Sequence, residues 1–373
     1  MSLTREPIVV VTGSGGFIGT AIVKSLSSHY RVIGLDRDRP DDVPAGTDFI
    51  ECDLTDDTAV SRAFAGIGEK YGKRLASCIH LAAYYDFSGK PSPLYRSLTV
   101  EGTLRILREL RQFDAEQFVF SSTLLVMKPA EEESQTISES SPVEATWDYP
   151  KSKLAAESEI KRERDGIPAV ILRIAGVYNQ DCRSIPIAQH IARIYEKRLE
   201  SYFFPGDADH GQPFIHLDDL VGCVERVIEQ RRQLGEEELF LLAEPDVMSY
   251  ADLQERLGEL IHGQEWPTIR IPKVVAKTGA WVKEKLAGEE DGAFIKPWMI
   301  DLADDHYPVA IDHACEKLGC HPQHRLRDTL PEMIASLKRN PAEWYKRNQL
   351  EPPEDAGQEN SKDRELQEAH DRK

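Results

Sequence analysis

The sequence predicts an α/β fold, in which a doubly wound parallel sheet is followed by a smaller C-terminal substrate-binding lobe. In the first half, strand-like runs alternate with amphipathic helical stretches, which is typical of parallel strands joined by right-handed helical crossovers. The first apolar run ends in a glycine-rich turn directly before a helical stretch. Beyond about residue 176 the alternation loosens into helices, proline-bearing loops and short strands.

The elements follow one another regularly. Residues 8–12, IVVVT, are apolar throughout or small, as expected of a strand buried on both faces. Ile18, Ile22 and Leu26 then recur at helical spacing. Further strand-like runs are RVIGLDR at 31–37, TDFIECDL at 47–54, ASCIHLAA at 76–83, QFVFSST at 117–123 and AVILRI at 169–174. Helical stretches near 57–65, at 97–112 and from 151 separate these runs.

The alternation suggests a division of the chain. We expect residues 1–176 to form a Rossmann-type domain, to which segments around 213–245 return, and residues 177–348 to form mainly the substrate-binding lobe. Residues 351–373 carry few apolar side chains and are expected to form a disordered tail. Residues 273–286 are amphipathic with lysines on the polar side, so they fit a lid or core helix better than a membrane-surface helix in so acidic a chain.

Charge and composition indicate which classes of partner the protein binds. The net charge of -18 disfavours nucleic acid and anionic membranes, both of which are bound mainly by clustered lysine and arginine, and therefore favours a small-molecule partner. The sequence shows no signal-peptide pattern and no apolar run long enough to span a bilayer, so we expect a cytoplasmic protein.

The six cysteines, at positions 52, 78, 182, 223, 315 and 320, show no disulfide-framework spacing. In a reducing compartment they are expected to act as small buried hydrophobic residues. His313, Cys315, Cys320, His321 and His324 have the atom types that zinc binds, but they lack the paired short spacings of zinc motifs. We therefore expect no metal site.

The glycine-rich turn has the spacing Gly13-x-x-Gly16-x-x-Gly19 between a strand and a helix. Glycines let a phosphate approach the backbone, and the start of the helix presents free N–H groups to it. A glycine triplet alone is weak evidence, because tight turns also use glycine. In this context, the turn predicts a binding site for the diphosphate of a dinucleotide.

The next strand supplies an acidic partner. Asp36 ends that strand, near the distance expected for a carboxylate that accepts hydrogen bonds from an adenosine ribose, which favours NAD. Arg37 and Arg39 follow and are able to bind a 2′-phosphate, so NADP stays open. Asp53 and Leu54 follow the third strand, where Asp53 is placed either to reach the adenine or to cap the next helix.

The segment Tyr149-Pro-Lys-Ser-Lys153 is the second signal. With Pro150 in a first helical turn, Tyr149 and Lys153 lie four residues apart on one face. A nearby ammonium lowers the pKa of a phenol and so makes it a better proton shuttle. Upstream, Thr123 ends a central strand, where it can donate a hydrogen bond to a substrate oxygen, although hydroxyls at strand ends often only satisfy local backbone.

With these residues in place, the chain resembles the extended branch of the short-chain dehydrogenase/reductase superfamily, the NAD-dependent epimerase/dehydratase family. The resemblance spans about residues 8–348, and the motifs occur in family order. They are TGSGGFIG at 12–19, Asp36, CDL at 52–54, HLAA at 80–83, SST at 121–123, YPKSK at 149–153, LRIAGVY at 172–178 and PFIHLDDL at 213–220.

The resemblance implies a catalytic set of Thr123, Tyr149 and Lys153, with hydride transfer at the nicotinamide C4 of the cofactor. It also implies dimers as the usual assembly. The cofactor-binding residues are expected to be Gly13, Ser14, Gly16, Phe17, Ile18, Gly19, Asp36, Arg37, Asp53, Leu54, Leu81, Ala82 and Ala83, together with Tyr149 and Lys153.

The chain also departs from the family pattern. Thr99 stands where the family often has an active-site Asn, and Leu124-Leu125 replace the Asp-Glu pair of sugar-nucleotide dehydratases, which disfavours dehydration. Ala175 and Gln212 replace the Asn and Arg that hold a diphosphate in nucleotide-sugar epimerases.

These departures bear on the substrate. We expect Tyr85, Asp86 and Leu124 to contact it and its side of the site to be fairly apolar, although these side chains fit a core role equally well. The favoured reaction is therefore net oxidation or reduction of a secondary alcohol or ketone. A nucleotide-sugar epimerase with retained NAD is the close alternative, and a catalytically silent dinucleotide-sensing protein is an alternative of another class.

Overall fold

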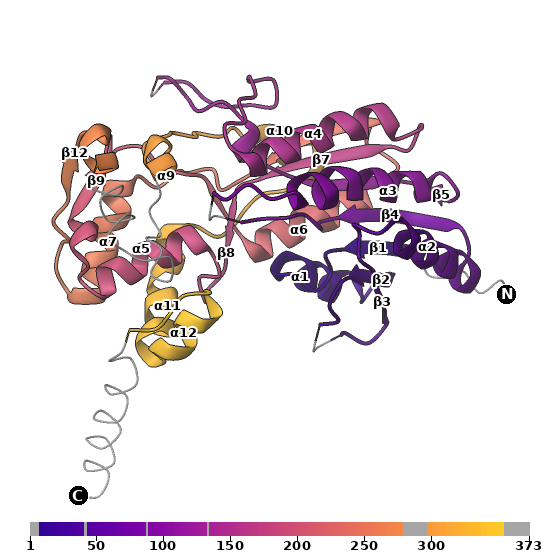
Figure 1. Ribbon diagram of the computed structural model, residues 1–373, viewed down its shortest axis with the longest axis horizontal. Coiled ribbons are helices and arrows are strands. Elements are labelled where there is room, and N and C mark those ends of the chain that lie inside the picture. Colours follow the sequence, from indigo (N-terminus) through magenta and orange to yellow (C-terminus); the bar gives the residue numbers. More distant parts are fainter. Residues whose placement is uncertain (1–6, 41–42, 87–88, 133, 279–296, 354–373) are drawn as a thin grey trace, which may run out of the picture. The chain divides into compact units, whose positions relative to one another are not determined.

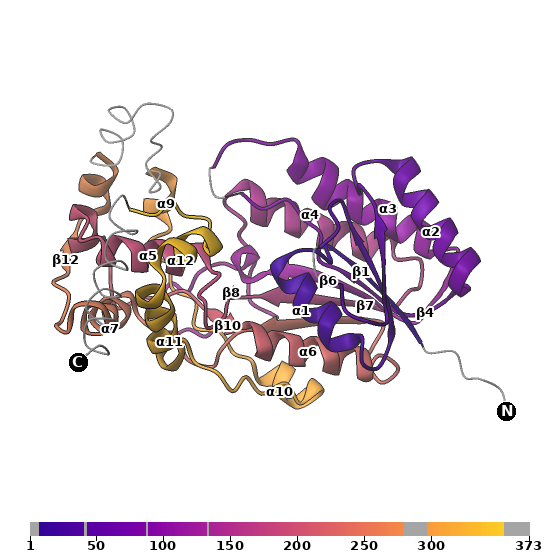
Figure 2. The ribbon, with the colours of Figure 1, turned by 90° about the horizontal axis from the view of Figure 1, so that it is seen from below.

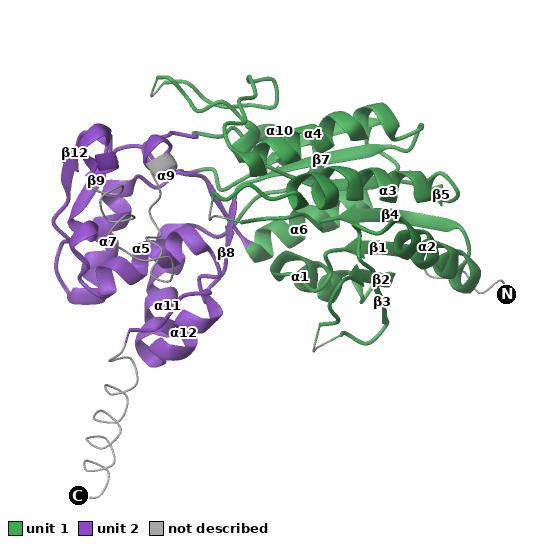
Figure 3. Cartoon of the chain, in the orientation of Figure 1, with its two compact units in different colours: residues 1–175, 217–245, 308–323 green, residues 176–216, 246–307, 324–373 purple. Residues whose placement is uncertain are grey.

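The computed structural model describes residues 7–40, 43–86, 89–132, 134–278 and 297–353. The chain forms two compact units, coloured separately in Figure 3. Unit 1 comprises residues 1–175, 217–245 and 308–323, and unit 2 comprises residues 176–216, 246–307 and 324–373. Residues 217–245 thus lie in unit 1, and so does the stretch 308–323, which was expected to belong to the substrate-binding lobe.

Unit 1 is built on a parallel sheet with the order β11-β7-β6-β4-β1-β2-β3 (Figure 1). Its strands are β1 (Ile8–Thr12), β2 (Arg31–Asp36), β3 (Thr47–Glu51), β4 (Arg74–His80), β6 (Phe118–Thr123), β7 (Ala169–Ile174) and β11 (Glu237–Leu242), and the short β5 (Asp114–Ala115) pairs with β4. The order of the strands reverses between β1 and β4, which is where open α/β sheets bind their ligands.

Helices cover both faces of this sheet. In Figure 2, α2 (Asp57–Tyr71), α3 (Glu101–Leu110) and α4 (Asp148–Glu163) lie on one face, and α1 (Phe17–Leu26) and α6 (Leu217–Glu229) lie on the other with α10 (Asp312–Leu318). Because both faces are covered, the strands are almost wholly apolar, and β1 is buried along its whole length. The prediction of a doubly wound α/β fold is confirmed.

Two predicted helices differ in their details. The helix expected near 57–65 continues to Tyr71, and Asp56 caps its start by accepting from the backbone N–H groups of Thr58 and Ala59. The stretch expected as one helix at 97–112 begins as a π-helix, η1 (Tyr95–Val100), and continues as α3. Such wide turns are uncommon and often occur near functional sites.

The expectation for the cysteines is wrong for one pair. Cys223 on α6 and Cys320 after α10 form a disulfide, with their Cα atoms 5.1 Å apart. The two residues are 97 positions apart in the sequence, so their spacing did not predict the pair. Among the described cysteines, 52, 78 and 182 are free and buried as expected, and Cys315 is free and half-buried.

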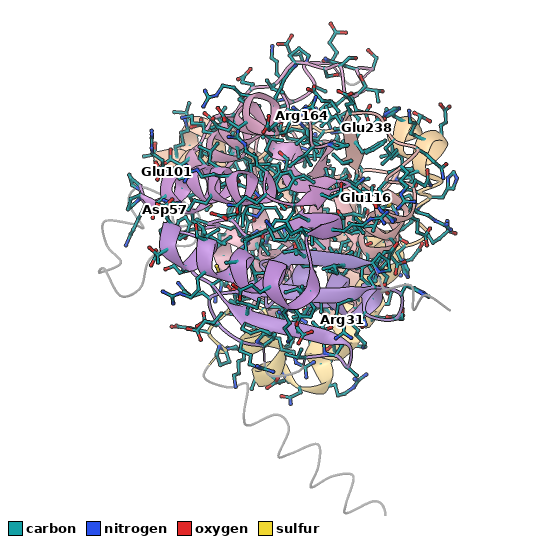
Figure 4. All side chains as sticks on the ribbon, turned by 90° about the vertical axis from the view of Figure 1, so that its right-hand side faces the viewer. Arg31, Asp57, Glu101, Glu116, Arg164 and Glu238 are labelled. Carbon is teal, nitrogen blue, oxygen red and sulfur yellow. A yellow bond between two sulfur atoms is a disulfide. The ribbon has the colours of Figure 1, made fainter. Side chains whose placement is uncertain are left out.

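The edge where the strands begin is rich in ion pairs, and Figure 4 labels Arg31, Glu116 and Arg164 at this end. Arg31 pairs with Asp48 at 3.2 Å, and Glu116 pairs with Arg231 at 2.7 Å. Glu116 directly precedes Gln117 and strand β6, whereas Thr123 ends that strand at the opposite, carboxyl edge. The ion pairs of Arg31 and Glu116 therefore lie at the edge of the sheet opposite to the predicted site residues.

Unit 2 has its own core, which packs Tyr178, Ile191, Leu257, Leu330 and Trp344 with neighbouring apolar side chains. Its elements are β8 (Gly176–Tyr178), α5 (Ile185–Tyr195), η3 (Leu199–Tyr202), β9 (Phe203–Pro205), β10 (Phe214–His216), α7 (Tyr250–His262), β12 (Ile269–Ile271), α9 (Pro297–Asp301), α11 (Leu326–Arg339) and α12 (Pro341–Arg347).

Two predicted segments fall partly outside the description. The helix expected at 273–286 is helical at 273–278, and its remainder lies outside the described residues, as do residues 354–373 of the predicted tail. Within the described part of the chain, no helix combines the length and apolar character needed to cross a membrane.

Candidate active site

The glycine turn closes tightly between β1 and α1. Gly13 has a φ of 70°, a left-handed conformation that favours glycine, and its N–H donates to the Leu35 carbonyl at 2.9 Å. A Cβ on Gly13 would lie 2.8 Å from the Ala82 nitrogen, and one on Gly19 would overlap the Gly13 carbonyl oxygen. Gly16 is the N-cap of α1. The turn is therefore a bare backbone cradle at a helix start, which fits a diphosphate.

Asp36 lies beside this turn. Its carboxylate accepts from the Gly15 N–H at 2.8 Å and from the Arg37 N–H at 2.7 Å, so it is fixed at the end of β2. A fixed negative charge here suits ribose hydroxyls and repels a 2′-phosphate. Arg37 pairs with the exposed Asp38, and the Arg39 guanidinium lies 5.7 Å from the centre of the Phe49 ring.

Asp53 has a local role in the structure. Its carboxylate accepts from the backbone N–H and the hydroxyl of Thr55, at 2.8 and 2.7 Å. These bonds lower the pKa of Asp53, with the backbone N–H of Thr55 as the largest cause. Asp56, not Asp53, caps α2. Leu54 is buried in the core of unit 1, and Asp53 is exposed at the carboxyl edge of the sheet.

The segment after β4 closes against the glycine turn. The Leu81 N–H donates to the Thr12 carbonyl at 3.2 Å, and the Ala82 N–H reaches the Thr12 hydroxyl at 3.4 Å. The structure therefore brings the predicted cofactor residues Gly13, Leu81 and Ala82 together. Ser14, Phe17 and Ile18 belong to the same turn and the first turn of α1, and Ala83 follows Ala82.

Beneath this contact lies a chain of buried hydrogen bonds that runs through His80. Thr103 donates to the Thr99 carbonyl at 2.6 Å, so its hydroxyl oxygen is left to accept from His80 Nε2 at 3.0 Å. His80 Nδ1 then accepts from the Thr12 hydroxyl at 2.6 Å. Burial, reinforced by Lys153, lowers the pKa of His80 to about 3. A neutral histidine thus joins the glycine turn to α3.

Thr123 ends β6 and is almost wholly buried. Its hydroxyl accepts from the Leu125 N–H at 3.3 Å, where the 3-10 turn η2 (Leu124–Val126) begins. Because the hydroxyl hydrogen is not used in that bond, it stays available for donation to a substrate oxygen. Thr123 therefore satisfies local backbone and still offers the donor expected of it.

Tyr149 lies in the first turn of α4, and aromatic rings surround it. The Tyr85 ring is 4.7 Å away in an edge-to-face arrangement, and the Trp147 ring is 5.5 Å away. Tyr85 is half-exposed, whereas Leu124 is buried. The Asp86 carboxylate accepts from the Tyr84 hydroxyl at 3.3 Å, and its carbonyl accepts from Tyr95 at 3.0 Å. The expected substrate residues thus divide into an exposed aromatic ring, a hydrogen-bonded acid and a core leucine.

Lys153 is one helical turn beyond Tyr149 and is 2% exposed. Its Nζ donates to the Ser121 carbonyl at 2.6 Å and lies 5.9 Å from the centre of the Tyr149 ring. It also lies 4.8 Å from the centre of the Phe120 ring. α4 therefore presents the phenol and the amine of the predicted pair to the carboxyl end of β6.

The charges of this pair follow from burial. Burial raises the pKa of the Tyr149 phenol above its ordinary value of 10.0, so the phenol is protonated at neutral pH without its cofactor. Burial also lowers the pKa of Lys153 to about 7, and Glu157 opposes that shift. Lys153 thus titrates near neutrality. The expected lowering of the phenol's pKa by Lys153 does not offset burial in the protein alone.

Several site residues escaped sequence analysis. His80 and Trp147 had no assigned role, and neither did the buried ion pair between Glu157 and Arg173. Two of these had a visible signal. Glu157 follows Lys153 by four residues on the same helical face, and Arg173 is a charge inside the apolar run AVILRI.

The possible zinc-binding group is not assembled as one cluster. Cys320 is held in the disulfide, and the His313 ring stacks on Phe240 at 5.0 Å between ring centres. His313 also lies 3.9 Å from the Glu238 carboxylate. Both residues thus contribute to the packing of the stretch 308–323 within unit 1.

A glycine cradle at a helix start, an acid at the end of the second strand, and a Tyr-Lys pair at the end of a central strand define a dinucleotide-dependent enzyme of the short-chain dehydrogenase/reductase type. The model of the NAD dependent epimerase/dehydratase family matches residues 9–243, and the chain belongs to this family. The expectation of an enzyme that uses NAD is confirmed with it.

Curated relatives point the same way. The chain is 26% identical to a UDP-glucose 4-epimerase from Streptomyces lividans, over 74% of this chain and 89% of that protein. It is 24% identical to a UDP-glucose 4-epimerase from Vibrio cholerae, over 86% of this chain and 92% of that protein.

Solved structures share the fold. The UDP-glucose 4-epimerase of Thermotoga maritima, solved with UDP-glucose, matches with a TM-score of 0.67 at 19% identity, over 89% of this chain and 99% of that one. The UDP-glucose 4-epimerase of Thermus thermophilus, solved with NAD, matches with a TM-score of 0.66 at 20% identity, over 89% of this chain and 99% of that one.

Proposed function

We propose that this protein is an NAD-dependent epimerase that inverts a secondary alcohol carbon of a nucleotide-linked sugar. The observation that carries the proposal is the position of Lys153, one helical turn beyond Tyr149, with its Nζ bonded to the Ser121 carbonyl two residues before Thr123, in the same unit as the glycine turn. Relatives named as UDP-glucose 4-epimerases support the sugar-nucleotide interpretation over the net oxidation that the apolar side chains favoured.

The glycine turn would hold the diphosphate of NAD, and Asp36 would accept from its adenosine ribose. Arg37, Asp53 and Leu54 would border the adenosine, and Leu81, Ala82 and Ala83 would line the cofactor near the nicotinamide. Bound NAD supplies a carbon that takes up a hydride and gives it back.

The protein's own residues would move the proton. Tyr149 would take the proton of the sugar hydroxyl as hydride leaves the carbon, and would return it when hydride adds to the other face. Thr123 would donate a hydrogen bond to the same oxygen. Lys153, as a cation, would stabilise the phenolate of Tyr149 and contact the ribose of the cofactor. Both directions use the same three side chains, so the sugar leaves with inverted configuration and NAD unchanged.

Replacement of the phenol tests this assignment. We expect Tyr149→Phe to retain NAD and to lower turnover about 10²- to 10⁴-fold, because only the proton-transfer group is lost. Tyr30→Phe, a substitution in the same unit away from the site, is the matched control and should keep full activity. Product epimers are measured by NMR and NADH by absorbance. Turnover by Tyr149→Phe equal to that of the control would refute the assignment.

Net oxidation or reduction of a more apolar alcohol is the second candidate. Tyr85 and Trp147, the aromatic rings beside Tyr149, favour it. Stoichiometric accumulation of NADH with an apolar secondary alcohol, and no epimer from sugar nucleotides, would establish it over the epimerase. In either case Tyr85 and Asp86 are proposed to contact the substrate.

We further propose that the protein is a cytoplasmic homodimer. The family resemblance supports the dimer. Sedimentation analysis of the full chain gives the assembly directly. A single species with the mass of one chain, 42.1 kDa, across micromolar concentrations would contradict the dimer.

A further inference from the structure

A buried ion pair lies directly behind the Tyr149 and Lys153 pair. Arg173 on β7 donates to Glu157 on α4 through two nitrogens, with Nε to Oε1 at 3.1 Å and Nη2 to Oε2 at 2.7 Å. The side chains are 8% and 11% exposed. Arg173 also contacts the sulfur of Met127 at 2.9 Å. Such two-pronged pairs fix geometry as well as charge.

The same pair reaches the end of β6. The Ser122 hydroxyl donates to Glu157 Oε1, and Ser122 lies between Ser121, which accepts from Lys153, and Thr123. Glu157 is also one helical turn beyond Lys153 on α4, so the two side chains share a helix face. One carboxylate therefore links α4 to both strands that meet the predicted catalytic residues.

The charges around Lys153 are few. Within the described part of the chain, the ionisable groups that act on Lys153 or Tyr149 are Glu157 on α4, the neutral His80 on β4, Tyr95 on η1 and Tyr85 after β4. Arg173 on β7 is bonded to the same Glu157 carboxylate. The charged side chains of α3 turn elsewhere, since Arg105 and Arg108 pair with Asp57 on α2. η2 contributes only Leu124, Leu125 and Val126.

Burial strengthens the effect of these charges on Lys153. In a buried setting a unit charge a helical turn away acts on its neighbour far more strongly than in water. Glu157 raises the pKa of Lys153, and Arg173, whose positive charge is bonded to the same carboxylate, would offset part of that effect. Loss of either would leave an uncompensated buried charge beside the amine.

We propose that Glu157 and Arg173 are positioning residues, which hold α4 against the ends of β6 and β7 and together set the charge that Lys153 experiences. The proposal rests on the proposed function, in which Lys153 works as a cation. The pair touches neither substrate nor cofactor in this account, and it acts through the geometry and charge of Lys153 and Tyr149.

Two single substitutions of opposite sign test the proposal. Glu157→Gln removes a negative charge and leaves Arg173 unpaired, so the titration midpoint of Lys153 should fall by about one pH unit. Arg173→Gln leaves Glu157 unpaired and should raise that midpoint by a similar amount. The double variant Glu157→Gln with Arg173→Gln should return the midpoint to near the native value.

The readout is NMR of protein labelled with ¹³C-lysine, in which the Lys153 signal is assigned by its loss in Lys153→Met. This measurement needs no substrate, so its outcome is independent of whether epimerisation is the right reaction. With a working substrate, both limbs of the pH profile of kcat/KM should move in the same direction as the Lys153 midpoint. An unchanged Lys153 midpoint refutes the inference, whereas an absence of epimer refutes only the proposed function.

Controls separate charge from structure. Glu116→Gln breaks the ion pairs of Glu116 with Arg74, Arg231 and Arg232 at the other end of β6, about 20 Å away for six residues of strand, and should leave the Lys153 midpoint unchanged. Arg173→Lys keeps the charge but loses the two-pronged contact, so it should lower kcat without moving the midpoint. If Arg173→Gln does not fold, the Lys153 midpoints of Glu157→Gln and Arg173→Lys still test the proposal. The proposal would be overturned if Glu157→Gln and Arg173→Gln shifted the Lys153 midpoint in the same direction. It would also be overturned if neither shift were larger than that of Glu116→Gln.

Discussion

Gly19 has no room for a side chain. A Cβ there would overlap the carbonyl oxygen of Gly13, which the turn cannot move without losing the hydrogen bond that this oxygen accepts from the Gly16 N–H. Gly66 in α2 is the opposite case, since an added Cβ meets nothing within 4 Å. Gly19 is thus a glycine that the turn requires, whereas Gly66 is one that the helix only tolerates.

We therefore expect Gly19→Ala to abolish NAD binding and to lower the free energy of unfolding by about 1–3 kcal/mol, as a steric strain at the turn. Gly66→Ala should instead raise the free energy of unfolding by about 0.5–1 kcal/mol, because alanine is the better helix former. Urea unfolding and NAD titration by calorimetry measure both effects. Full NAD affinity in Gly19→Ala would contradict the assigned role of the turn.

His80 makes a second prediction at this scale. Its pKa is about 3 in the folded protein and 6.5 ordinarily, so below pH 6.5 the unfolded chain binds a proton that the folded protein does not. The contribution of His80 to stability is therefore full above pH 6.5 and falls by about 1.4 kcal/mol per pH unit below it, down to about pH 3.

The prediction is checked by the slope of unfolding free energy against pH in His80→Gln. That slope should be shallower than in the native protein between pH 6.5 and 5, where the group differs most. Equal slopes in the native protein and in His80→Gln would show that His80 does not remain neutral in the fold.

At the scale of elements, the disulfide joins α6 to the stretch after α10. Further contacts hold the same stretch, since the Gln230 amide donates to the Leu318 carbonyl at 2.8 Å and the Gln323 N–H donates to Asp219 at 3.0 Å. Because the cross-link closes a long loop, it restricts the unfolded chain more than the folded one.

We expect Cys320→Ser to lower the free energy of unfolding by about 2–4 kcal/mol in non-reducing buffer. Addition of dithiothreitol should destabilise the native protein and leave Cys320→Ser unchanged. Cys315→Ser, which removes a free thiol from neighbouring α10, is the matched control and should respond to the reductant as the native protein does. An insensitive native protein would mean that the thiols are not joined in solution.

Features set by residues close together in the sequence could be predicted, whereas contacts between residues far apart in the sequence could not. Strands β1 and β6 were predictable because a strand buried on both faces has a nearly unbroken apolar run, and Thr123 and Asp36 because strand ends meet at one edge. The buried hydrogen bonds of His80 were not predictable, because the partners of His80 lie 23 and 68 residues away in the sequence. The Cys223–Cys320 pair escaped for the same reason. The π-helical turn η1 was not predicted either, and its Thr99 hydroxyl accepts from the Tyr84 N–H, which is 15 residues away in the sequence.

At the scale of the whole molecule, two separate cores support the two units, one around Ile33, Phe64, Leu107 and Phe120 and the other within unit 2. The predicted cofactor residues all belong to unit 1. A ligand that binds only the folded state raises the midpoint of thermal unfolding with its concentration.

NAD should therefore raise the melting temperature of the full chain more than NADP at equal concentration, because Asp36 repels a 2′-phosphate. Asp36→Ala should reduce or reverse that difference, and Asp114→Ala, which changes an exposed acid at the other edge of the sheet, should preserve it. Differential scanning fluorimetry gives both comparisons. A larger shift with NADP in the native protein would contradict the role given to Asp36.

The backbone passes from one unit to the other five times, after residues 175, 216, 245, 307 and 323. No single cut therefore yields an intact half, and a gene fragment that ends after β7 lacks both the strand that flanks β7 and the helix that packs on α1. Exchange of one half between homologous genes would need matched breakpoints at every passage. Recombination should thus favour inheritance of the two halves together, so that the specificity of one and the cofactor preference of the other change mainly by point substitution.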